Sequence, residues 1–163
     1  MPEAITNTSP ALYLYRIGAL DWLSVLFSET WIPSAVVLEL KEGQRRGYDV
    51  PNPNDYPWLQ VIDPRSMPSE WLTSDLGPGE RAAMALALEN PDRVVLLDDA
   101  LARRIAQAAG LQVWGTLGVL LEAKSQGLTL SIEPLVNRLE DSGMWISDKI
   151  RQRVLTLAGE TKD

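Results

Sequence analysis

Residues 93–109, RVVLLDDALARRIAQAA, decide the fold class, because a short apolar run is followed at once by a helical pattern. The run Arg93–Leu97 predicts a buried strand, and Ala100–Ala109 predicts a helix. Asp98 and Asp99 lie at the junction between them. A strand that leads directly into a helix is the repeating unit of α/β folds with a parallel sheet.

The same alternation extends outward in both directions, which predicts a three-layer α/β/α fold around a mostly parallel sheet. Residues 47–55 separate two such units and predict a turn-rich loop. Further strands are expected at Glu3–Thr6, Leu59–Ile62 and Leu111–Trp114. Further helices are expected at Ala11–Leu26 (broken near Gly18), Pro33–Arg46, Gly79–Glu89, Leu117–Gln126, Ile132–Asp141 and Ser147–Ala158.

The composition excludes much of the usual catalytic chemistry. The 163 residues contain no cysteine and no histidine, so thiol chemistry, histidine triads and His/Cys zinc sites are ruled out. An enzyme with this composition must depend on carboxylates. The length predicts a single domain over residues 1–163, with residues 143–163 as a C-terminal helical extension.

Charge and hydropathy limit the partners and the location. The net charge of −7 argues against a broad phosphate-binding surface, although metal ions can supply local positive charge in a nuclease. No apolar run approaches the ~20 residues that a membrane helix needs. The first residues show no secretory signal, so we expect a cytoplasmic protein without a membrane partner.

Polar residues directly follow three of the predicted strands, and in a parallel sheet these positions share one edge. Capping of the next helix is the alternative interpretation for several of them, and Asp99 has the further alternative of an ion pair with Arg103 four residues on. The three groups are Asn7-Thr8-Ser9, Asp98-Asp99 and Gly115-Thr116.

Two glutamates indicate a site more directly. Glu39 interrupts the apolar helical segment Val36–Leu40, and no basic residue lies three or four positions from it. An unpaired, partly buried carboxylate is costly unless a charged group meets it. Glu80 begins a predicted helix, where an acid also interacts favourably with the helix N-terminus. Oxygen ligands without nitrogen or sulfur suit Mg²⁺ or Mn²⁺, and such ions support phosphodiester hydrolysis.

Five blocks in this order resemble the PIN-domain family of VapC-type ribonucleases, in a branch of bacterial PIN-like proteins. They extend over nearly the whole chain. The blocks are Ile5–Pro10, Ile32–Leu40, Leu76–Glu80, Leu96–Arg103 and Gly115–Leu121.

The resemblance implies a Mg²⁺- or Mn²⁺-dependent endoribonuclease. Such proteins are commonly homodimers, and many are the toxin of a toxin–antitoxin pair, so RNA and a small antitoxin protein are the implied partners. The implied catalytic positions are Asn7, Glu39, Glu80 and Asp98, with Glu39, Glu80 and either Asp98 or Asp99 as metal ligands. Supporting positions fall on Thr8, Ser9, Thr116 and Arg103, with Arg81 and Lys124 as further basic candidates.

Asn7 departs from the family pattern, because it stands where the first acid is usual. An amide still offers a carbonyl oxygen, but it removes one negative charge and cannot act as a base. We therefore expect weak metal binding, which a neighbouring acid such as Asp99 would strengthen.

The alternative is a PIN-like interaction module whose nuclease site has decayed, and Asn7 and the acidic surface favour it. The six tryptophans would support this alternative if they were exposed and clustered, whereas dispersed buried ones would not. An aspartyl-phosphate phosphatase is disfavoured, because the first strand ends in Asn7 and offers no nucleophilic aspartate.

Overall fold

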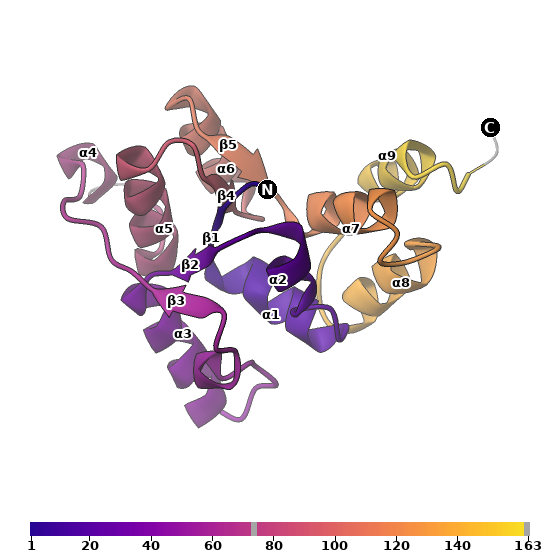
Figure 1. The fold of residues 1–163 in the computed structure, drawn as a ribbon, viewed down its shortest axis with the longest axis horizontal. Coiled ribbons are helices and arrows are strands. Elements are labelled where there is room, and N and C mark those ends of the chain that lie inside the picture. Colours follow the sequence, from indigo (N-terminus) through magenta and orange to yellow (C-terminus); the bar gives the residue numbers. More distant parts are fainter. Residues whose placement is uncertain (73–74, 162–163) are drawn as a thin grey trace.

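The structure is a computed structural model that describes residues 1–72 and 75–161 (Figure 1). Its strands are β1 (Ala4–Thr6), β2 (Thr30–Ile32), β3 (Leu59–Val61), β4 (Val94–Leu96) and β5 (Gln112–Trp114). Within the described residues they form one five-stranded sheet in the order β3-β2-β1-β4-β5, and every neighbouring pair is parallel. The predicted three-layer α/β/α fold with a mostly parallel sheet is thereby confirmed.

Helices connect the strands and extend the chain after the last of them. Those of the first half are α1 (Thr8–Arg16), α2 (Trp22–Leu26), α3 (Ser34–Arg45), the 3-10 turn η1 (Pro53–Asp55) and α4 (Ser69–Leu72). Those of the second half are α5 (Pro78–Glu89), α6 (Ala100–Ala108), α7 (Thr116–Ser125), α8 (Glu133–Asp141) and α9 (Asp148–Leu157). No helix of the described residues is long and apolar enough to cross a membrane.

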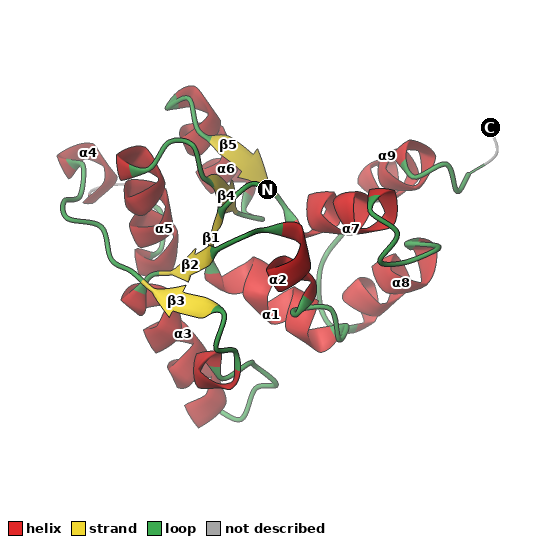
Figure 2. Ribbon diagram, viewed as in Figure 1, coloured by secondary structure: helices red, strands yellow, loops and turns green. Residues whose placement is uncertain are grey.

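The sheet separates two apolar cores because successive strand residues point to opposite faces. Ala4, Val94 and Leu96 pack with α1, α2 and the three C-terminal helices, whereas Ile5 and Val95 pack with α5 and α6. Helix α3 forms a smaller cluster with Ile32 and Leu59 and packs against α5. In Figure 2 the strands accordingly run between helices on both sides.

The sequence did not predict strand β2, which is only three residues long and lies between two helical patterns. It occupies the position next to the central strand β1 and leads into α3, so it determines where that helix begins. Helix α1 begins at Thr8, three residues earlier than predicted. The predicted break is confirmed at Gly18, whose φ of +75° ends the helical path.

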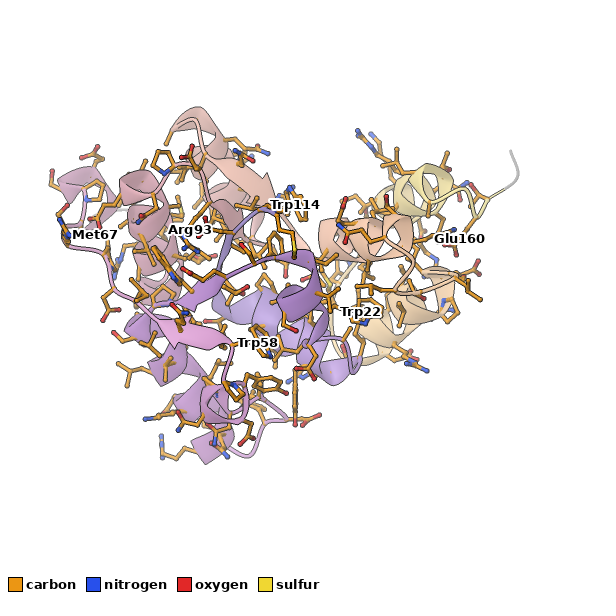
Figure 3. The ribbon with its side chains drawn as sticks, in the orientation of Figure 1. Trp22, Trp58, Met67, Arg93, Trp114 and Glu160 are labelled. Carbon is orange, nitrogen blue, oxygen red and sulfur yellow. The ribbon has the colours of Figure 1, made fainter. Side chains whose placement is uncertain are left out.

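A buried arginine clamps the amino-terminal side of the sheet. The Arg93 guanidinium lies 3.3 Å from the centre of the Trp31 ring, donates to the carbonyl of Ala4 at 3.2 Å, and pairs with Glu3 and Glu29. Figure 3 shows Arg93 inside the sheet region, away from the C-terminal helices. This clamp joins the beginnings of β1, β2 and β4, at the side opposite to the strand ends that carry the polar residues.

The C-terminal segment is fixed by Glu160, labelled beside the C-terminal helices in Figure 3. Its carboxylate accepts hydrogen bonds from the backbone N–H groups of Ile132 and Glu133 and from the Ser131 hydroxyl, so it caps α8 from outside that helix. Lys124 of α7 donates to Glu160 at 2.9 Å and to the carbonyl of Ala158 at 2.6 Å. Burial alone would raise the pKa of Glu160, but these hydrogen bonds outweigh it and lower the pKa to about 2.

We expect Glu160→Gln to lower the free energy of unfolding by about 1–3 kcal/mol at neutral pH, because it removes charge-assisted hydrogen bonds. A lowered folded-state pKa gives stability that is fully present above the unfolded-state value and is lost as the pH falls. The difference between the variant and the wild type should therefore shrink between pH 4.5 and about 2. Urea denaturation at several pH values measures it; a difference that does not change with pH contradicts the assignment.

Candidate functional site

The polar residues predicted to share one edge of the sheet do so. Asn7 follows β1, Asp98 follows β4 and Thr116 follows β5, and these strands are adjacent and parallel. The backbone N–H of Asn7 also donates to the carbonyl of Leu96 at 3.2 Å, which ties the ends of β1 and β4 together. Glu39 and Glu80 reach the same region from α3 and α5.

Glu39 is held by a hydroxyl from the neighbouring helix. The Thr8 Oγ1–H donates to Glu39 Oε1 at 2.8 Å. Thr8 therefore uses its side chain to orient a carboxylate, and the capping alternative is wrong for this residue. The bond also joins the residue after Asn7 to Glu39, although 31 positions separate the two partners.

Gly79 provides the space for the Glu39 carboxylate. A Cβ atom at Gly79 would lie only 2.0 Å from Glu39 Oε1, which is far inside van der Waals contact. The first turn of α5 therefore approaches Glu39 as closely as a glycine allows. We did not predict a role for Gly79; the signal that the sequence offers is a glycine directly before a candidate acid, Glu80.

Glu80 combines a capping role with a place in the site. Its Oε1 accepts from the backbone N–H of Gly77 at 3.0 Å, so the predicted interaction with the helix N-terminus is present. Burial nevertheless raises the pKa of Glu80, against the Gly77 hydrogen bond, and the charges of Asp99 and Glu39 raise the pKa further. Glu80 thus lies between two other carboxylates.

Asp98 is fixed by Thr116. Its Oδ1 accepts from the backbone N–H of Thr116 at 2.7 Å, and its Oδ2 accepts from the Thr116 hydroxyl at 2.7 Å. Burial raises the pKa of Asp98, and the Thr116 hydrogen bonds and the Arg103 charge only partly oppose this. A Cβ at Gly115 would lie 2.7 Å from an Arg103 nitrogen and 3.1 Å from Asp98 Oδ1, so this glycine also makes room for the site.

Asp99 caps the helix that follows it, and the alternative of an ion pair with Arg103 is wrong. Its side chain accepts from the backbone N–H of Ala102 at 3.0 Å and so caps α6. None of the ion pairs in the described residues joins it to Arg103, which donates to the carbonyl of Leu97 at 3.0 Å instead. Asp99 contributes negative charge near Glu80. Asp98 remains the better candidate for the catalytic position that follows β4.

Asn7 has a buried oxygen atom without a partner. The residue is only 4% exposed, and its Oδ1 meets no hydrogen-bond donor among the described residues. It precedes α1 but does not cap that helix with its side chain. Buried polar atoms almost always have partners, so an unsatisfied carbonyl oxygen at this edge fits an external donor or a cation.

The four candidate acids have no ion-pair partner within residues 1–72 and 75–161: none of the ion pairs there includes Glu39, Glu80, Asp98 or Asp99. The Arg103 charge acts on Asp98 without forming an ion pair. The same residues contain no group of three acids close enough together to hold a metal. Two carboxylates and an amide oxygen nevertheless suit Mg²⁺, which keeps several waters and commonly binds through one or two carboxylates. The donor set therefore fits a hard divalent cation.

The remaining predicted residues divide into near and distant ones. Ser9 lies in the first turn of α1 beside Thr8, and Arg81 follows Glu80 in α5. The prediction that Lys124 is a basic residue of the site is wrong, because its ammonium group donates to the Glu160 carboxylate and to the Ala158 carbonyl. The tryptophans do not form an exposed cluster: Trp71 is 7% exposed, Trp145 is 83% exposed, and the other four are half-buried.

The comparison with protein families agrees with this geometry. Residues 3–160 match the family DUF3368, described as a PIN domain. The chain belongs to the PIN-domain family. This family has a nuclease-type fold, which suggests an interaction with nucleic acids. No curated protein matches the chain.

The raised pKa of Glu80 predicts that this acid destabilises the fold when it is ionised. A raised carboxyl pKa lowers stability as the pH rises through the interval above 4.5. We expect Glu80→Gln to increase the free energy of unfolding by roughly 0.5–1 kcal/mol at neutral pH, with the gain disappearing below pH about 4.5. Urea denaturation measures it, with Glu133→Gln, an exposed acid in the first turn of α8, as the control. A destabilised Glu80→Gln variant at neutral pH would contradict the prediction.

The close approach at Gly79 predicts strong coupling with Glu39. Gly79→Ala alone should cost up to about 1 kcal/mol, because its methyl group displaces the carboxylate and breaks the hydrogen bond from Thr8. In a Glu39→Ala background the same change should be neutral or stabilising by up to about 1 kcal/mol, since alanine favours the helix. A double-mutant cycle in urea measures the coupling. Gly118→Ala serves as the control, because its Cβ would meet only Trp114 Cβ at 3.7 Å; equal costs of Gly79→Ala in both backgrounds would exclude the contact.

Proposed function

We propose that the protein is a divalent-metal-dependent endoribonuclease and that Asn7, Glu39, Glu80 and Asp98 form its catalytic site. The observation that carries the proposal is that, among the described residues, Glu39 and Glu80 have no ion-pair partner and the buried Asn7 oxygen at the same edge of the sheet has no hydrogen-bond donor. A PIN-domain chain with this donor set, and without histidine or cysteine, has carboxylate chemistry available to it. Mg²⁺ or Mn²⁺, when bound, would activate water and stabilise the charge that develops on the phosphodiester.

Each residue has a defined part in this proposal. Glu39 and Glu80 would hold the cation, with Thr8 fixing the orientation of Glu39. Asn7 would offer a neutral oxygen at the same place. Asp98, whose two oxygens already accept from Thr116, would act by holding the edge of the site in shape and adding negative charge. Arg103 lies near Asp98, where it would meet a phosphate of the substrate.

Family resemblance extends the proposal to the biological setting. We place the protein in the cytoplasm as the toxin of a toxin–antitoxin pair, working as a homodimer and restrained by a small antitoxin protein. A decayed PIN-like module that binds a protein partner is the second candidate, and the neutral Asn7 favours it. The two candidates differ in metal binding, which a decayed site would lack.

Titration calorimetry with Mn²⁺ tests the metal site. We expect Glu39→Gln to weaken binding at least about tenfold, because a charged ligand is lost, and Asn7→Asp to strengthen it by a similar factor. Glu42→Gln is the matched control: it lies on the same helix, but Arg45 and Arg46 neutralise it, so binding should be unchanged.

Cleavage of a labelled single-stranded RNA, with Mn²⁺ and with a chelator, then tests the activity. Cleavage should require Mn²⁺ and should be lost in Glu39→Gln but not in Glu42→Gln. Metal binding without cleavage of RNA would contradict the nuclease proposal. No Mn²⁺ binding in the wild type or in any variant would favour the decayed module instead.

A further inference from the structure

A second feature lies directly beside the carboxylates: a cavity of about 760 Å³. Its lining includes the charged residues Asp98, Asp99 and Arg103 and the apolar residues Trp114, Trp145 and Ile150. Its volume falls within the ~300–1,000 Å³ that is usual for ligand pockets. Because Asp98 belongs to both, a molecule in the cavity would lie next to any phosphodiester held at the proposed catalytic site.

Trp145 stands out at this cavity because it is 83% exposed. The backbone on both sides of it is anchored: the Met144 N–H donates to the Leu139 carbonyl at 3.0 Å, and Ile146 is buried in the core. The next residue, Ser147, caps α9 by accepting from the Ile150 N–H at 3.2 Å. The indole is therefore presented to solvent by a fixed segment, which lowers the entropy cost of binding a ligand against it.

A second indole, that of Trp114, also lines the cavity. Trp114 lies where β5 meets α7 (Figure 3), and its ring packs against Phe27 at 5.4 Å between centroids. Glu122 of α7 also lines the cavity and offers a carboxylate acceptor. Two indoles, an acceptor and a guanidinium form a set that suits a flat ring with an N–H donor and a phosphate attached to it.

We propose that this cavity is a nucleobase subsite, in which Trp145 stacks on one unpaired base adjacent to the scissile phosphodiester. The inference rests on the proposed nuclease function, since the cation there would offset the repulsion between the phosphate and the nearby acids. A base within a duplex presents no free face to the indole, so the subsite would select single-stranded RNA.

Fluorescence anisotropy with a cleavage-resistant phosphorothioate decauridylate in Mg²⁺ tests the subsite, with an abasic phosphorothioate decamer of equal charge for comparison. The wild type should bind the decauridylate about 5- to 150-fold more tightly, the range that corresponds to stacking of one base. Trp145→Ala should remove this preference, and Trp145→Phe should keep most of it. Leu130→Ala is the control, because Leu130 is 95% exposed and lies outside the cavity.

Several outcomes would overturn the proposal. A preference for the base that persists in Trp145→Ala, or its absence in the wild type, excludes the subsite. A change in molecular mass by light scattering in Trp145→Ala would make this surface an interface between copies of the chain. Mn²⁺ calorimetry on the wild type separates the two proposals: metal binding without a base preference overturns the subsite alone, whereas no metal binding overturns the nuclease function. Trp145→Ala should bind Mn²⁺ as tightly as the wild type, because the residue holds no part of the proposed metal site.

Discussion

The site depends on one contact, the Glu39 carboxylate held between the Thr8 hydroxyl and Gly79. The hydrogen bond from Thr8 ties α3 to the end of β1, and the missing side chain at Gly79 lets the first turn of α5 approach the same oxygen. Three segments that are distant in sequence therefore meet at one carboxylate. Once they meet there, Glu80 is both buried and brought into the field of Glu39; burial is the main cause of its raised pKa, and the charges of Asp99 and Glu39 add to it.

Stability is supplied elsewhere in the fold. Burial raises the pKa values of Glu80 and Asp98, and neighbouring carboxylates raise that of Glu80 further, so ionisation of these two acids works against folding at neutral pH. The opposite side of the sheet carries Arg93, stacked on Trp31 and paired with Glu3 and Glu29. The C-terminal helices are fixed by the Glu160 capping interactions. Ion pairs and helix caps thus stabilise parts of the fold outside the site, whereas the acids of the site form no ion pairs among the described residues.

The sequence predicted the fold well because the βα pattern is local. The strand at 93–97, the helices after it and the break at Gly18 all follow from periodicity and from single residues. Strand β2 escaped prediction because it lies between two helical patterns and leads directly into the second of them. The shared edge of Asn7, Asp98 and Thr116 followed from parallel topology, but pairing between side chains did not: Thr8 with Glu39 and Glu160 with the start of α8 are long-range contacts. The capping of α6 by Asp99 is, in contrast, a local contact, because the donor is the backbone N–H of Ala102 three residues on.

The neutral side chain of Asn7 limits the negative charge that gathers at this edge of the sheet. An aspartate at its buried position would place another negative charge near carboxylates that have no ion-pair partners among the described residues. It would raise the electrostatic cost of folding and raise the pKa of Glu80 further. An asparagine keeps an oxygen at the same place without that cost, at the expense of affinity for a cation. The same substitution therefore has opposite effects on the stability of the fold and on the strength of the proposed metal site, as expected where a functional cluster of acids is built into a small domain.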